Sequence, residues 1–178
     1  WPSPLARCER FGRRRSGGGE QRVAQRIPGS GEPRRRRSVQ DEHELDLAAD
    51  RVGLGLSAGG RPIVAERFGS VGGRRVLVIG VIHGDEDDGV AVVDELRSEP
   101  VPEGVELWIV ESMNPDGQAN QVRSNDNGVD LNRNFPYKWG PIGVPGDSQY
   151  AGAGPASEPE TQAMINFMGQ LRPDITVW

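Results

Sequence analysis

The chain has one cysteine and no long apolar segment, and each of these shortages excludes a class of protein. Cys8 has no second thiol to pair with, so an intrachain disulfide and a thiolate metal cluster are both excluded. No uninterrupted apolar run approaches the roughly 20 residues of a membrane helix, so we expect no membrane span. No signal-peptide-like apolar stretch follows Trp1, which favours a cytoplasmic location.

Basic residues are scarce over most of the chain and concentrated at its start. Residues 1–40 contain 11 arginines and three glutamates, a net charge of +8, whereas residues 41–178 carry −13. Apolar side chains in the first segment are sparse and aperiodic, so their burial cannot offset the entropy of ordering. We therefore expect residues 1–44 to form a disordered Arg/Gly-rich arm. Such an arm can bind nucleic acid or another anionic surface, but a solvated tail is commoner and a nucleic-acid partner is not expected.

Residues 45–178 alternate between strand and helix patterns, which predicts an α/β fold. β-branched and apolar runs predict strands over residues 52–57, 61–68, 75–82 and 105–111, with a further strand from Ile175. Apolar side chains at helical spacing predict helices over residues 88–97 and 158–171. The expected architecture is a mixed central β-sheet flanked by helices.

The stretch between the last two predicted strands is rich in Gly, Asn, Asp and Pro. Residues 114–155 show no clear periodicity, and loops of this length in compact domains are usually functional or disordered. Ser157 and Glu160 have the spacing of a capping box at the start of the following helix. Since capping explains residues 157–161, we assign them no catalytic role.

A histidine and a glutamate stand at the place where α/β sheets usually bind ligands. His83 directly follows the most apolar predicted strand, and Glu86 comes three residues later on a turn that enters a helix. Imidazole nitrogen and carboxylate oxygen at this spacing can converge on one zinc ion. The motif is short, and a loop histidine beside an acid that complements the helix dipole is the alternative.

Further motifs follow in a fixed order: N-P-D-G at 114–117, Arg123, G-V-D-L-N-R-N-F-P at 128–136 and S-E-P-E-T at 157–161. Together with H-x-x-E, this set resembles the zinc carboxypeptidase (metallocarboxypeptidase) family over residues 83–161, with looser similarity from about Leu54. The details H-G-D-E, R-x-N-x-N-G-V-D and S-E-P-E-T-Q-A look closest to the murein peptide amidase branch. Those enzymes cut the amide between γ-D-glutamate and diaminopimelate in cell-wall peptides.

The resemblance implies a Zn²⁺ cofactor and a role for each motif residue. His83 and Glu86 are implied zinc ligands, and Asp130 is implied to hold the His83 ring through its other nitrogen. Arg123 is implied to stabilise the oxyanion beside zinc. Asn132 and Arg133 are implied to bind the terminal carboxylate of the substrate, a peptide or murein peptide.

Two functional groups of the family have no counterpart in this sequence. The third zinc ligand is a histidine shortly after the strand that begins at Ile175, and the general-base glutamate lies further downstream. His43, the only other histidine, is not assigned to the metal. We therefore expect residues 45–178 to be the N-terminal portion of a larger, C-terminally truncated catalytic domain. The 178-residue chain itself is expected to be inactive and to bind zinc poorly.

Two other functions stay open at this point. An aspartoacylase-type zinc deacylase shares H-G-x-E and a D-L-N-R element, although the intact N-P-D-G and N-R-N-F-P motifs favour the carboxypeptidase-type hydrolase. A non-catalytic fragment with an anion-binding arginine arm is the other alternative. The oligomeric state cannot be inferred from the sequence.

Overall fold

The computed structural model describes residues 44–178. The expected arm at residues 1–44 lies outside the described residues except for Glu44, so its disorder and the domain boundary stay predictions.

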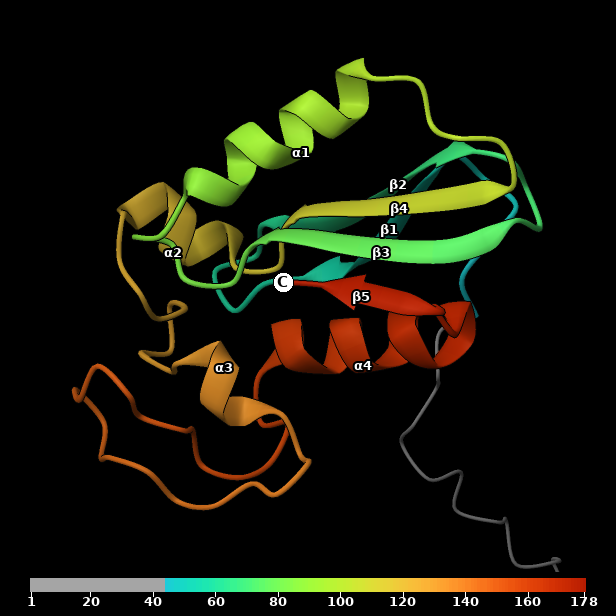
Figure 1. Cartoon of the computed structure of the whole chain (residues 1–178). Coiled ribbons are helices and arrows are strands. Elements are labelled where there is room, and N and C mark those ends of the chain that lie inside the picture. The colour runs from blue at the N-terminus through green and yellow to red at the C-terminus, as the bar shows by residue number, and fades with distance from the viewer. Residues whose placement is uncertain (1–43) are drawn as a thin grey trace, which may run out of the picture. The chain divides into compact units, whose positions relative to one another are not determined.

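A five-stranded mixed sheet forms the centre of the described chain, with strand order β1-β2-β4-β3-β5 (Figure 1). β2 pairs antiparallel with β1 and β4, whereas β3 pairs parallel with β4 and β5. The strands are β1 (Arg51–Leu56), β2 (Pro62–Gly69), β3 (Arg74–Val81), β4 (Val105–Ser112) and β5 (Ile175–Val177). Every strand expected from the sequence is present, and the mixed α/β architecture is confirmed.

Two helices cover the two faces of this sheet (Figure 1). α1 (Asp88–Ser98) packs on one face through Val93, and α4 (Pro159–Leu171) packs on the other through Met164 and Phe167. Two short helices, α2 (Pro115–Asn120) and α3 (Leu131–Asn134), lie in the segment between β4 and α4. The expected single long loop is therefore divided by helical turns.

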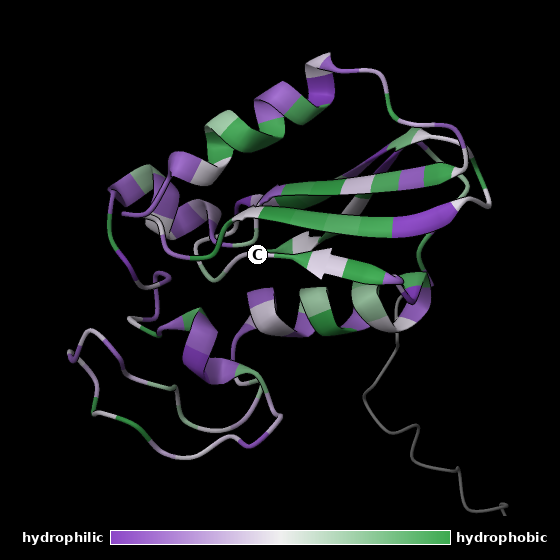
Figure 2. Cartoon of the chain, in the orientation of Figure 1, coloured by the Kyte–Doolittle hydropathy of each residue, from purple (hydrophilic) through white to green (hydrophobic). Residues whose placement is uncertain are grey.

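β3 is apolar on both sides because it lies between two separate cores. Leu77 and Ile79 belong to the core under α4, whereas Val78 belongs to the core under α1. The apolar colouring of β3 and β4 in Figure 2 follows from this double coverage. In the larger core, Trp108 packs edge-on against Phe167 with ring centroids 5.6 Å apart. Each fully buried large side chain contributes about 1.5–3 kcal/mol.

The expected capping box at the start of α4 is wrong. The N-cap is Glu158, and it makes no side-chain capping hydrogen bond. Ser157 Oγ instead donates to Glu158 Oε1 at 2.7 Å. Glu160 cannot reach back to the helix start, because its buried carboxylate accepts the backbone N–H of Ala58 at 2.8 Å. The S-E-P-E-T motif therefore has a different structural role, described below.

None of the helices between residues 44 and 178 has the length and apolarity needed to cross a bilayer.

Candidate active site

The site residues lie at the carboxyl ends of two neighbouring parallel strands. Val81 at the end of β3 pairs with Ser112 at the end of β4, so the loops that follow both strands emerge at one edge of the sheet. His83 lies on the first loop and Asn114 begins α2 on the second. This edge is where open α/β sheets usually bind ligands.

A glycine allows these two loops to pack directly against each other. A Cβ placed on Gly84 would collide with the backbone of Gly117, so a larger residue requires the backbone of one loop to shift. The histidine-bearing loop and the N-P-D-G turn therefore form one packed unit, although 30 or so positions separate them in the sequence.

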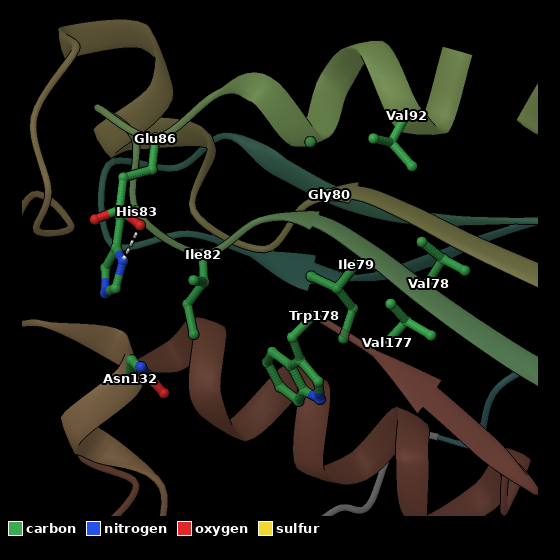
Figure 3. A pocket seen from close by; sticks show the side chains of 11 residues that line it. Val78, Ile79, Gly80, Ile82, His83, Glu86, Val92, Asn132, Val177 and Trp178 are labelled. Carbon is green, nitrogen blue, oxygen red and sulfur yellow. Dashed lines mark hydrogen bonds and ion pairs between the residues drawn. The ribbon is translucent and has the colours of Figure 1, made fainter. Parts of the chain in front are cut away.

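His83 is held by carboxylates at both of its ring nitrogens. Its side chain is buried, with Nε2 2.9 Å from Asp130 Oδ1 and Nδ1 3.1 Å from Glu86 Oε2 (Figure 3 shows the contact with Glu86). Asp130 is fully buried and also accepts the N–H of Asn132 at 3.0 Å and Arg123 Nε at 3.0 Å. In the tautomer with the proton on Nε2, His83 donates to the Asp130 carboxylate and Nδ1 is directed towards Glu86.

The pair formed by His83 Nδ1 and Glu86 can take up a cation. With the proton on Nε2, the ring presents the Nδ1 lone pair to a carboxylate oxygen 3.1 Å away. In that tautomer both atoms are acceptors, and one metal ion can bind to both. Zinc takes imidazole nitrogen and carboxylate oxygen, so His83 and Glu86 fit two positions of a zinc site.

Glu86 is kept ionised by its neighbours. The neighbouring His83 ring lowers the pKa of Glu86 most, and Arg123 lowers it further, against a rise from burial that is smaller than the effect of His83. Arg123 Nη1 donates to Glu86 Oε1 at 2.8 Å. A carboxylate that stays charged at neutral pH is the form that binds a metal ion.

The structure brings five of the six expected site residues together. His83, Glu86, Arg123 and Asp130 form one hydrogen-bonded cluster. Asn132 lies on the same cavity as His83 and Glu86, a space of about 510 Å³ whose other wall is apolar and includes Trp178 (Figure 3). Arg133 is half-buried, its Nη1 contacts its neighbour's carbonyl, and it is not among the described residues that line this cavity.

Two buried asparagines of the site region had no role in the sequence analysis. Asn114 is fully buried, and its Nδ2 donates to the carbonyls of Ile82 at 3.1 Å and Arg123 at 3.2 Å. It therefore ties the residue before His83 to Arg123. Asn134 is fully buried as well, and its Oδ1 accepts the N–H of Glu158 at 3.2 Å. Their places in N-P-D-G and N-R-N-F-P were the only available signal.

The turn between β1 and β2 is fastened to α2 through a buried aspartate. Asp116 accepts hydrogen bonds from Ser57 Oγ at 2.8 Å, the N–H of Gly59 at 2.7 Å and Arg61 Nη1 at 2.6 Å. Burial raises the pKa of Asp116, but these three donors outweigh it and the pKa lies below its usual value. Asp116 is therefore a structural anion rather than a member of the metal site.

His83 and Glu86 are two candidate metal ligands among the described residues. Within residues 44–178, no group of three or more His, Cys, Asp or Glu side chains is arranged to hold a metal ion. A catalytic zinc site needs three protein ligands, and His83 with Glu86 provides two. The assignment of His83 and Glu86 as ligands, and of a third ligand elsewhere, stays a prediction.

Comparisons with known proteins agree with the fold. The family model for zinc carboxypeptidases matches residues 47–177. Murein peptide amidase A of Escherichia coli (strain K12) is 34% identical over an alignment of 108 positions that covers 54% of this chain and 45% of that protein. Carboxypeptidase SOL1 of Arabidopsis thaliana is 29% identical over an alignment of 136 positions that covers 67% of this chain and 26% of that protein. The chain thus spans less than half the length of these relatives.

Solved structures show the same fold. The crystal structure of murein-tripeptide amidase MpaA from Escherichia coli O157 superposes with a TM-score of 0.62 at 26% identity, covering 79% of this chain and 63% of that one. Carboxypeptidase A from Helicoverpa armigera superposes with a TM-score of 0.57 at 23% identity, covering 68% and 37%. Since the family model matches most of its length, the chain belongs to the zinc carboxypeptidase family.

Proposed function

We propose that the protein containing this chain is a zinc-dependent hydrolase that cleaves a peptide or amide bond next to a free carboxylate. The observation that carries this proposal is the cluster of His83, Glu86, Arg123 and Asp130 at the carboxyl end of β3. It combines two zinc-type ligands, a carboxylate that orients the imidazole, and a guanidinium beside them.

In the proposed mechanism each residue has a separate task. His83 and Glu86 hold the metal together with a third ligand from outside the described residues. Zinc, when bound, polarises the scissile carbonyl and lowers the pKa of a water molecule. Asp130 keeps the proton on His83 Nε2, so that Nδ1 stays available. Proton transfer requires a general base from elsewhere in the protein.

Substrate recognition is proposed to come from the polar side chains around this cluster. Arg123 lies 2.8 Å from Glu86, so its guanidinium is close enough to stabilise an oxyanion that develops beside the metal. Asn132 presents its side chain to the cavity, and Arg133 is its neighbour on α3. An amide and a guanidinium suit the recognition of a terminal carboxylate, although Arg133 has to turn towards the cavity to take part.

Cell-wall peptides are the proposed substrate class. Two relatives, one matched by sequence and one by structure, carry murein peptide or murein tripeptide in their names. The proposed bond is therefore the amide between γ-D-glutamate and diaminopimelate. A cytoplasmic location stays a prediction.

The protein expressed from its complete gene tests this function. We expect it to bind one zinc ion and to hydrolyse L-alanyl-γ-D-glutamyl-diaminopimelate. His83→Ala is expected to lose the zinc. Replacing a residue that only orients a metal ligand lowers activity about 10–100-fold, so replacing a ligand is expected to lower it more than roughly 100-fold. His43→Ala is the matched control and is expected to keep both. Turnover of N-acetylaspartate in place of the tripeptide would support the deacylase alternative, and His83→Ala with full activity would refute the zinc site.

A further inference from the structure

We propose that Asn125 is a positioning residue, which the buried carboxylates of Glu158 and Glu160 hold in place so that it sets the geometry of Arg123 and Asp130. The inference rests on the proposed function, because the positions of these two residues matter only if they serve the hydrolytic site. It gives a role to the S-E-P-E-T and R-x-N-x-N motifs, which the proposed mechanism leaves unexplained.

Asn125 shapes the loop that carries both site residues. It is 3% exposed, and its Oδ1 accepts the backbone N–H groups of Asn127 at 3.1 Å and Val129 at 3.0 Å. Its own backbone N–H donates to the carbonyl of Val129 at 3.0 Å. These bonds close a turn between Arg123 and Asp130, whose side chains are joined at 3.0 Å. A change in this turn therefore changes how the guanidinium meets the carboxylate.

Two buried carboxylates fix the other side of the same amide group. Asn125 Nδ2 donates to Glu158 Oε2 at 2.8 Å and to Glu160 Oε2 at 3.0 Å. Glu160 is fully buried, and its other oxygen accepts the N–H of Ala58 in the β1–β2 turn. Glu158 also accepts Asn127 Nδ2 at 2.8 Å. The start of α4 thereby holds the active-site loop, and both donors and both acceptor positions of Asn125 are in use.

The requirement for asparagine follows from this donor and acceptor pattern. An aspartate at 125 keeps the acceptor for the two backbone N–H groups but places a third carboxylate against Glu158 and Glu160. Burial and, less strongly, the charge of Glu158 already raise the pKa of Glu160, so a further negative charge beside these carboxylates is unfavourable. The amide of asparagine supplies an acceptor for the two backbone N–H groups and donors for the two carboxylates, and it adds no charge.

The hydrogen bond from Asn125 to Glu160 can be reversed by exchanging donor and acceptor between the two residues. In Glu160→Gln, a glutamine whose oxygen still accepts the Ala58 N–H turns its NH₂ group towards Asn125 Nδ2, so two donors face each other. In Asn125→Asp, an acceptor faces an acceptor. The double variant Asn125→Asp/Glu160→Gln restores one donor to one acceptor. Glu103→Gln, at an exposed position, is the matched control.

Two readouts are measured on each variant. The first is kcat and KM of the zinc-loaded protein from the complete gene, using the murein tripeptide. The second is hydrogen exchange of Arg123 Nε–H by NMR in the 178-residue chain, which needs neither metal nor turnover. Thermal unfolding is recorded in parallel to identify variants that fail to fold.

We expect each single variant to lower kcat about 10–100-fold, the range for residues that orient site groups, with little change in KM. Exchange of Arg123 Nε–H is expected to accelerate in both single variants and to slow again in the double variant, whose kcat recovers at least about 10-fold. The proposal is overturned if well-folded single variants keep slow exchange, or if the double variant is no better than either single. If the wild type has no turnover, the proposed function fails, and the exchange measurement still decides the role of Asn125.

Discussion

His83 Nε2 lies 2.9 Å from Oδ1 of Asp130, a carboxylate with no exposed surface. The same carboxylate accepts hydrogen bonds from Arg123 Nε and from the backbone of Asn132. One buried anion therefore fixes the orientation of a proposed metal ligand, a proposed oxyanion-binding arginine and a proposed substrate-binding residue. In this account the geometry of the site depends on Asp130 more than on any of the groups that touch substrate.

Replacing Asp130 by Asn should weaken zinc binding without removing a ligand. An amide can accept from Arg123 or donate to His83 but cannot serve all three partners, so the proton on Nε2 is no longer fixed. The zinc affinity of the protein expressed from its complete gene, measured by competition with a chelator, is expected to fall about 10–100-fold. Asp147→Asn, at an exposed position, serves as the control. An unchanged zinc affinity in Asp130→Asn would contradict the orienting role.

Replacing Asn114 by Asp should destabilise the fold around the site. The variant loses both donors to the carbonyls of Ile82 and Arg123 and brings a negative charge against them. Leaving buried acceptors unsatisfied costs about 1–3 kcal/mol each, so urea unfolding is expected to show a loss of roughly 2–5 kcal/mol. Asn120→Ala, in the exposed last turn of α2, is expected to change stability by less than about 1 kcal/mol. Equal effects of the two variants would contradict this description of Asn114.

Replacing Gly84 by Ala should separate the two loops of the site. The added methyl group meets the backbone of Gly117, which cannot move aside as a side chain does. Overpacking of this kind costs about 1–3 kcal/mol in unfolding free energy. Gly140→Ala is the control, because a Cβ there meets no atom within 4 Å. Thermal or urea unfolding of both variants tests the contact, and a Gly84→Ala protein as stable as Gly140→Ala would show that the loops do not pack closely.

The lowered pKa of Asp116 predicts that the folded protein loses stability in acid. Its donors hold its folded-state pKa below the unperturbed value of 3.8, so the folded state binds the proton less readily than the unfolded state does. Its contribution is therefore complete above pH 4 or so and disappears as the pH falls towards the folded-state pKa. Asp116→Asn should flatten the dependence of the unfolding free energy on pH between about 5 and 3. A slope in Asp116→Asn identical to that of the wild type would refute the assignment.

The sequence predicted those parts of the fold whose residues bury apolar surface in a regular pattern. β3 was recognisable because both of its faces are covered, and α4 because Met164, Phe167 and Leu171 share one face. α2 and α3 were not predicted, because helices of six and four residues have no apolar period and depend on the caps Asn114 and Asp130.

The candidate site was predictable to the extent that its residues stand in recognisable motifs. The contact between His83 and Asp130 was expected from the family resemblance, and the structure places the two side chains in contact. The roles of Asn125 and Glu160 depend on partners more than 30 positions away along the chain, which no local pattern specifies. For the same reason, Ser157 and Glu160 were mistaken for a capping box: their spacing fits the motif, but tertiary contacts direct Glu160 inwards.

The central claim is most directly tested by comparing two substrates for the protein expressed from its complete gene. One is L-alanyl-γ-D-glutamyl-diaminopimelate, and the other is the same tripeptide with the carboxylate next to the scissile bond converted to an amide. The account predicts zinc-dependent cleavage of the first, at least about 10-fold slower cleavage of the second, and loss of this preference in Arg133→Ala or Asn132→Ala. Equal cleavage of both substrates, or cleavage that persists in His83→Ala, would contradict it.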